Sequence, residues 1–225
     1  LKRKPQLRST DSACSPRSGC RNSHRQIPNR RLRMFERFEG AFNGSETELS
    51  SANNADKQAG EPLDILARIF GGRSFGGGVY RVIERGKRDD WGKQIALAFP
   101  RHGKNVCCFG YDWLGRVFGV RVTRDGHELG PIYMFVPGTG KVLEIPRSVV
   151  AFHDEELLEF SDEALAGEFY ADWIRSGGVQ PEYHQCIGYK IPLFLGGKDD
   201  ITNLELSDID VYWWITGQLI ARLEQ

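Results

Sequence analysis

The spacing of apolar residues predicts two helices in the N-terminal third of the chain. Aromatic residues recur at helical spacing over 35–42 and predict a short helix. Polar residues dominate 44–60, which predicts a linker. Pro62 then begins a second apolar stripe of helical period, and Gly71-Gly72 follows it, as expected for a helix with a proline at its start and glycine at its end.

The apolar period changes to two after residue 76, which predicts strands. The connections between the strand-like segments are rich in Gly and Asp, and most are too short for a crossover helix. The six predicted strands are 79–84, 94–99, 105–110, 116–122, 132–136 and 142–145. We therefore expect a mostly antiparallel, meander-like sheet.

A helical period returns after residue 146. Ser161 is expected to cap a helix that ends at Gly177-Gly178. Ser207 and Asp210 have the spacing of a capping box, which predicts that the last helix begins at Ser207. Strands followed by helices indicate an α+β fold, a sheet of about six strands with flanking and C-terminal helices.

The string Pro-Gly-Thr-Gly-Lys at 137–141 is similar to a nucleotide-binding phosphate loop. Phe135 occupies the position of the first glycine of that motif, and Val142 that of the magnesium-binding hydroxyl. A strand-like pattern follows the string where the motif requires a helix. We therefore expect a hairpin whose two glycines adopt positive φ angles.

The formal charge of the whole chain is zero, but the charge is unevenly distributed. Residues 1–33 contain ten Lys or Arg and a single acid, a charge of +9, so the remainder carries −9. This basic arm has too few apolar residues to fold alone. Three interpretations compete: a nucleic-acid-binding arm, a transit peptide, or an upstream extension of a reading frame that starts at Met34. We favour the third.

These patterns predict four segments. They are a disordered basic arm (1–33), a short helix with a polar linker (34–61), a helix with the antiparallel sheet (62–147), and a helical C-terminal part packed on the sheet (148–225). We expect the last two segments to fold as one unit.

The five cysteines include no C-x-x-C pair, and no secretory signal is recognisable. Cys107 and Cys108 are adjacent on a predicted strand, so their side chains should face opposite sides of the sheet. No apolar stretch is long enough to span a membrane, so we expect no membrane partner. We predict a cytoplasmic protein.

No arrangement of residues argues for catalysis, a metal or a cofactor. His184 and Cys186 would share one face of an extended segment, but two ligands are too few for a metal site. Asp112, His127, His153 and Asp154 are scattered. The Gly-Gly-Lys-Asp-Asp string at 196–200 places two acids where an anion would bind, which favours a tight turn. We therefore expect a protein that is not an enzyme and needs no cofactor.

Two acidic runs are the most informative feature of the composition. Residues 154–172 hold eight acids and 199–210 hold five, and neither run contains Lys or Arg. Such runs can be a solvated face that keeps the protein soluble. The alternative is a surface complementary to a basic partner, such as the DNA-binding side of a nuclease. A body of this charge should itself repel DNA, so we expect no nucleic-acid binding by 34–225.

Four segments of the sequence resemble the type VI secretion immunity family. They are GYKIPLFLGGKDDITNLELSDIDVYWWITGQL (188–219), FGYDWLGRVFGV (109–120) and FHDEELLEF (152–160), with FGGRSFGGGVYRV (70–82) matching the start of the pattern. The resemblance extends over about 62–223, and the family's C-terminal domain often follows a GAD-like segment. The resemblance implies a cytoplasmic, non-catalytic protein that neutralises a cognate toxin, in the founding case a DNase effector.

The resemblance transfers no toxin-contacting positions, so the expected interface is electrostatic. We expect the toxin to contact exposed aromatic anchors with acids around them. The predicted interface residues are Asp154, Glu155, Glu156, Glu159, Asp162, Glu163, Tyr183, Tyr189, Asp199, Asp200 and Trp214.

Two alternatives to this function stay open. One is an immunity or scaffold protein of the other large bacterial immunity superfamily, typified by yeast cell-wall regulators, whose Trp-containing helix followed by Gly-Gly is not clearly present. The other is an enzyme, which a deep pocket lined by His153, His184, Asp112 and Cys186 would favour.

Overall fold

The computed structural model describes residues 34–42 and 60–223. The predicted arm (1–33) and most of the predicted linker lie outside the described residues. The helices near the start are α1 (Glu36–Phe42) and α2 (Pro62–Phe70), both in predicted positions. Phe35 and Phe38 are fully buried, as are Ile65, Leu66 and Phe70.

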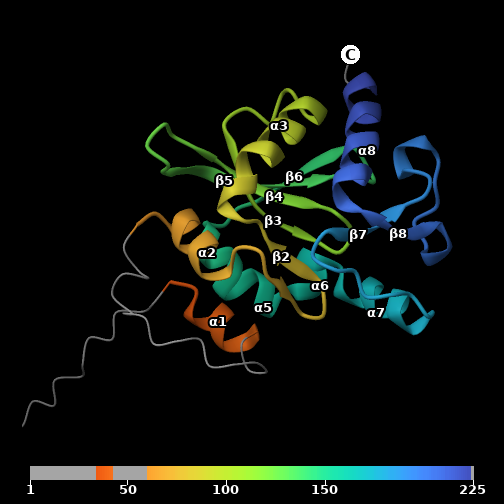
Figure 1. Cartoon of the computed structure of the whole chain (residues 1–225), viewed down its shortest axis with the longest axis horizontal. Helices are drawn as coiled ribbons and strands as arrows, with labels where there is room; N and C mark the ends of the chain where they lie inside the picture. Colours follow the sequence, from red (N-terminus) through yellow and green to blue (C-terminus); the bar gives the residue numbers. More distant parts are fainter. Residues whose placement is uncertain (1–33, 43–59, 224–225) are drawn as a thin grey trace, which may run out of the picture. The chain divides into compact units, whose positions relative to one another are not determined.

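A six-stranded sheet forms the centre of the fold (Figure 1). Its order is β1-β2-β3-β4-β5-β6, and every neighbouring pair is antiparallel, so the predicted meander is confirmed. The strands are β1 (Ser74–Phe75), β2 (Tyr80–Val82), β3 (Val106–Asp112), β4 (Val117–Val122), β5 (Glu128–Val136) and β6 (Lys141–Ile145).

One predicted strand is wrong. Residues 94–99 lie mostly in the helix α3 (Arg88–Ala98), which follows the short 3-10 helix η2 (Arg85–Lys87). Trp91, Ile95 and Ala98 are buried at helical spacing, and this pattern outweighs the local alternation of 94–99. The sixth strand is instead β1, whose two residues are too few to show a period.

The helical region after residue 146 is more divided than predicted. It contains α4 (Val149–Ala151), the π-helical η3 (Phe152–Glu156), α5 (Leu157–Glu159), α6 (Ser161–Leu165) and α7 (Gly167–Arg175). Ser161 is the first residue of α6 rather than its cap, and Ala166 interrupts the predicted single helix with a φ of 52°. A left-handed residue ends the hydrogen-bonded ladder, so α6 and α7 are separate helices.

A hairpin of β7 (Gln185–Tyr189) and β8 (Leu204–Asp208) lies in the part predicted to be helical. The 3-10 turns η4 (Leu193–Leu195) and η5 (Ile201–Asn203) occupy its connection. Ser207 is in β8, so it does not begin the last helix. The helix α8 (Ile209–Leu223) is capped by Asp208, whose Oδ1 accepts the backbone N–H groups of Asp210 (3.0 Å) and Val211 (3.1 Å).

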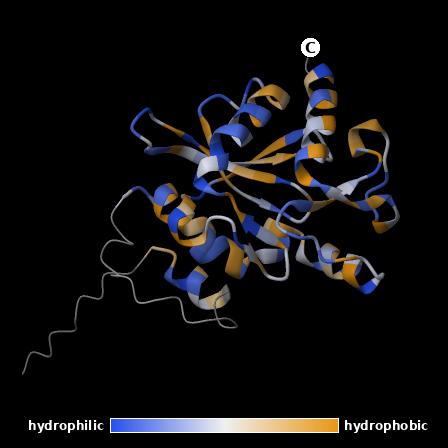
Figure 2. Cartoon of the chain, viewed as in Figure 1, coloured by the Kyte–Doolittle hydropathy of each residue, from blue (hydrophilic) through white to orange (hydrophobic). Residues whose placement is uncertain are grey.

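Helices cover both faces of the sheet (Figure 1). One core joins the sheet to α1, α2 and α4–α6, and includes Phe109 and Phe118. A second core joins the opposite face to α3 and α8. Cys108 belongs to the second core and Cys107 packs against the first, as their adjacent positions predict. In Figure 2, hydrophobic residues occur on the central strands and on the helices, where they alternate with hydrophilic residues.

The string at 137–141 forms the β5–β6 hairpin, as predicted. Only Gly140 has a positive φ, of 63°, so the expectation for Gly138 is wrong. Gly138 is needed for space: a Cβ there would lie 2.6 Å from Cδ2 of Tyr189. Its carbonyl also accepts the Leu193 N–H at 2.8 Å, so this turn packs directly against the chain that follows β7.

Candidate functional site

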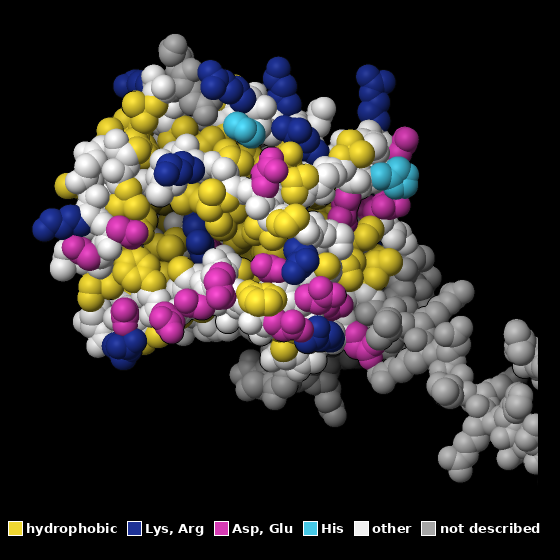
Figure 3. Space-filling view, turned by 180° about the vertical axis from the view of Figure 1, so that it is seen from behind, with side chains coloured by type: hydrophobic (Ala, Val, Ile, Leu, Met, Phe, Trp, Pro, Cys, Tyr) yellow, Lys and Arg dark blue, Asp and Glu magenta, His cyan; other side chains and the backbone are white. Residues whose placement is uncertain are grey.

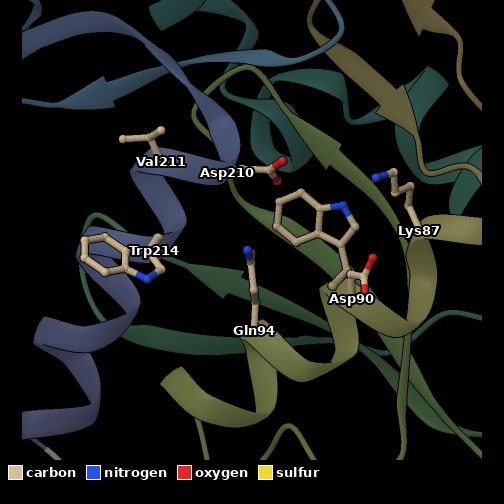
Figure 4. Close-up of a pocket in the computed structure, with 7 residues that line it drawn as sticks. Lys87, Asp90, Gln94, Asp210, Val211 and Trp214 are labelled. Carbon is tan, nitrogen blue, oxygen red and sulfur yellow. The ribbon is translucent and has the colours of Figure 1, made fainter.

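A hollow of about 380 Å³ lies between α3 and α8 (Figure 4). The two helices pack on the same face of the sheet and contact each other, so side chains along the line where they meet surround the hollow. The lining residues are Lys87, Asp90, Trp91, Gln94, Asp210, Val211 and Trp214.

The sequence of each helix determines which residues face the hollow. Trp91 and Trp213 point inwards, where their rings meet edge to face with centroids 6.0 Å apart. Trp214, the next residue around the helix from Trp213, is 65% exposed and points outwards. Gly217 of α8 faces α3, and a Cβ built there would make an ordinary contact of 3.5 Å with Cβ of Ala98. The buried tryptophan pair thus supports the base of the hollow.

The outward surface of these helices exposes large apolar side chains. Trp214 is 65% exposed and Val211 is 52% exposed. Ile215 on α8 is 49% exposed, and Leu97 on α3 is 60% exposed. Neighbouring exposed apolar side chains on a folded protein often mark an interaction site.

Two of the three charged side chains that line the hollow are acidic. Asp90 and Asp210 supply two carboxylates, and Lys87 supplies one ammonium group. Lys93 Nζ lies 3.2 Å from Oδ1 of Asp90, but both side chains are largely exposed, so this pair is weak. The Oε1 atom of Gln94 is buried and has no hydrogen-bond partner among the described residues. Figure 4 shows Gln94 extending from α3 into the space between the helices.

The acids of residues 154–163 that were predicted to contact the toxin lie on the opposite face of the sheet. Several of them form hydrogen bonds or ion pairs within the chain. Oδ1 of Asp154 accepts the Phe38 N–H at 3.0 Å, and Oδ1 of Asp162 accepts the Glu168 N–H at 2.7 Å. Glu156 pairs with Arg147 at 2.9 Å and Glu159 with Arg37 at 2.8 Å. Glu155 and Glu163 are exposed. Figure 3 shows acidic side chains gathered along the lower edge of that view.

The other predicted interface residues lie near the β7–β8 hairpin. Tyr183 is half-buried, and its hydroxyl donates to the Val82 carbonyl at 3.1 Å. The hydroxyl of Tyr189 donates to Oδ1 of Asp199 at 2.5 Å. Oδ1 of Asp200 accepts the Thr202 N–H at 2.9 Å, which stabilises the turn expected at 196–200. Both tyrosines are therefore engaged in internal hydrogen bonds.

The predicted interface residues thus occupy separate parts of the fold. Of these residues, Trp214 lines the α3–α8 hollow. Sequence reasoning missed the contributions of Asp90, Gln94, Val211 and Asp210 to this surface. The helical spacing of Asp90, Gln94 and Leu97 was the available signal, and assigning 94–99 to a strand concealed it.

The residues considered for an enzyme are not placed as a catalytic group. His153, Asp112 and Cys186 are fully buried, whereas His184 is exposed. Two further hollows, lined by residues around Arg88 and around Pro131, contain none of these four. In the part of the chain that the structure describes, no three His, Cys, Asp or Glu side chains gather in a way that could hold a metal ion. No helix among residues 34–42 and 60–223 could cross a membrane.

His153 stabilises the first core instead. Its Nε2 lies 3.0 Å from the Tyr80 hydroxyl and its Nδ1 lies 2.7 Å from the Val149 carbonyl oxygen. The rings of Phe35 and Phe38 meet it edge to face. Burial lowers the pKa of His153 to about 4, although the contact with Val149 acts in the opposite direction.

This pKa shift predicts a loss of stability in mild acid. The unfolded chain binds a proton at His153 near pH 6.5, whereas the folded protein binds it only near pH 4. The free energy of unfolding should therefore fall as pH decreases through this window, with His153 contributing about 3 kcal/mol. Urea denaturation at several pH values measures the slope. His153→Gln should flatten it relative to the unsubstituted chain, and equal slopes would contradict the assignment.

Comparisons with known proteins support the C-terminal resemblance. Residues 152–220 match the family model described as T6SS immunity protein Tdi1, C-terminal, which confirms the resemblance to type VI secretion immunity proteins over this part of the chain. The matched range contains most of α8. No curated protein matches the chain. The crystal structure of Atu4351 from Agrobacterium tumefaciens is similar at a TM-score of 0.53 and 15% identity, covering 82% of this chain and 89% of that one, which supports the fold alone.

Proposed function

Because residues 152–220 match the type VI secretion immunity family, we propose that this chain is an immunity protein. In this proposal it binds a cognate toxin and neutralises it by protein–protein contact, without chemistry of its own. The family match is the observation that carries the proposal. The buried positions of His153, Asp112 and Cys186 favour a binding protein over an enzyme.

We propose that the toxin is a DNase that acts in the cytoplasm. An enzyme that binds DNA needs basic groups for the phosphates, and this chain carries an excess of nine acids after residue 33. Opposite charges accelerate the encounter and favour contact at the DNA-binding side of the toxin. Binding there would block the active site or distort it.

The affinity should be high, because a small unbound fraction of a nuclease is lethal to its producer. We expect a one-to-one complex with a Kd of about 1 nM or below. Co-purification of the full chain with a catalytically inactive form of the toxin encoded beside its gene tests this proposal, and calorimetry then gives stoichiometry and affinity. A complex at that ratio supports immunity. Absence of binding at micromolar concentrations contradicts it.

The exposed acids of residues 154–163 should act through long-range attraction. The variant Glu155→Gln with Glu163→Gln removes two charges that make no internal ion pair in the described part of the chain. We expect association at low salt to slow about 2- to 5-fold, with dissociation unchanged and the difference abolished at high salt. Stopped-flow kinetics measures both rates. An unchanged association rate at low salt would exclude this face from steering.

A further inference from the structure

We infer that the hollow between α3 and α8 receives a segment of the toxin that carries an apolar side chain beside a lysine or arginine. The inference rests on the proposed immunity function and identifies the surface that performs it. Two properties of the hollow lead to this occupant: the apolar wall formed by Trp214 and Val211, and the two carboxylates, against one ammonium group, that line it.

The exposed apolar wall of the hollow favours an apolar side chain as its occupant. Trp214 and Val211 expose more than half of their surface, and both border the hollow. Tryptophan is enriched among the residues that dominate binding energy at protein interfaces, because it buries a large surface on docking. A volume of about 380 Å³ accommodates a large side chain with part of its backbone. A toxin segment with one apolar anchor would therefore cover the exposed indole.

The rim favours a basic neighbour for that anchor. Asp90 and Asp210 place carboxylates on the two helices that flank the hollow, against one ammonium group from Lys87. A lysine or arginine of the toxin could displace Lys93, which is held only by an exposed ion pair with Asp90. A toxin whose substrate is DNA offers such residues on its active-site face.

The base of the hollow is closely packed, so we expect little reordering of it on binding. Trp213 donates its Nε1–H to the Gly115 carbonyl at 2.7 Å, and its ring contacts those of Trp91 and Phe99. By contrast, Tyr183 and Tyr189 already use their hydroxyls within the chain. Among the three predicted anchors, Trp214 is therefore the one whose docking requires no internal hydrogen bond to break.

The test compares variants of the full chain binding to the catalytically inactive toxin encoded beside its gene. We expect Trp214→Ala to raise Kd by about 30-fold or more, mainly through faster dissociation. The variant Asp90→Asn with Asp210→Asn should slow association several-fold and reduce its salt dependence. Leu223→Ala is the matched control, because Leu223 is 62% exposed on the same helix but does not line the hollow. Circular dichroism verifies that each variant is folded.

The outcomes separate this inference from the proposed function. Weakened binding by Trp214→Ala with unchanged binding by Leu223→Ala supports the hollow as the docking surface. If the unsubstituted chain binds tightly and Trp214→Ala binds within 3-fold of it, the inference is overturned and immunity stands. If the unsubstituted chain does not bind the toxin, the proposed function fails and this inference fails with it.

Discussion

Replacing Trp213 with alanine should lower the free energy of unfolding by about 3 to 5 kcal/mol, because the substitution leaves a large cavity in the second core. Trp213 is 1% exposed and contacts Trp91 and Phe99. Its Nε1–H bonds to the Gly115 carbonyl, which would lose its donor. Urea denaturation followed by circular dichroism measures the loss.

The neighbouring Trp214 provides the control for this prediction. It has the same side chain on the same helix, but it is 65% exposed, so Trp214→Ala should change the free energy of unfolding by less than about 1 kcal/mol. Equal effects of the two substitutions would contradict an orientation of α8 that buries Trp213 and exposes Trp214. The expected contrast is loss of stability at Trp213 and loss of toxin binding at Trp214.

Replacing Asp112 with alanine should cost about 3 to 5 kcal/mol, because it breaks a buried charge network. Oδ1 of Asp112 accepts the N–H groups of Leu114 (3.0 Å) and Arg116 (2.9 Å), and its Oδ2 accepts Nε–H of Arg116. The Arg116 side chain is only 12% exposed, so its charge would lose its partner in a poorly solvated place. Burial itself raises the pKa of Asp112, against the attraction of Arg116.

An exposed ion pair gives the comparison for Asp112. Arg37 and Glu159 lie 2.8 Å apart, with side chains 54% and 49% exposed. Arg37→Ala should therefore change the free energy of unfolding by no more than about 1 kcal/mol, because solvent screens this pair. Thermal or urea denaturation of both variants measures the difference. A small effect at Asp112, similar to that at Arg37, would contradict a structural role for the buried network.

The meander was predictable from the sequence because its strands follow one another and are joined by short connections. Alternation identifies β2, β3, β4, β5 and β6 directly, and a short Gly-rich connection leaves only antiparallel pairing between β5 and β6. The helix α2 was equally predictable, since Pro62 and Gly71 mark its ends.

The remaining elements depend on contacts that local patterns do not contain. The helix α3 has a short buried face, so its last residues also show the alternation of a strand. The strands β7 and β8 pair across a connection of 14 residues that contains two 3-10 turns. The break at Ala166 places a non-glycine residue in the left-handed region, which no sequence rule signals.

The candidate site was only partly predictable for the same reason. The sequence predicts Trp214 as an exposed anchor, and the structure places it at the α3–α8 hollow. Asp90 and Gln94, which line the same hollow, lie on α3. The sequence pattern predicts a connection and then a strand (94–99) for this helix. The acidic runs were visible in the sequence, but the contacts of Asp154 and Asp162 with backbone N–H groups depend on tertiary structure.

Growth rescue tests the central claim most directly. The toxin encoded beside this chain's gene is expressed in a sensitive bacterial host, alone or with the full chain. The account predicts that the toxin alone stops growth and degrades DNA, and that the full chain restores growth and co-purifies with the toxin. A toxic neighbour whose host is not protected by a folded, well-expressed chain would contradict the immunity function.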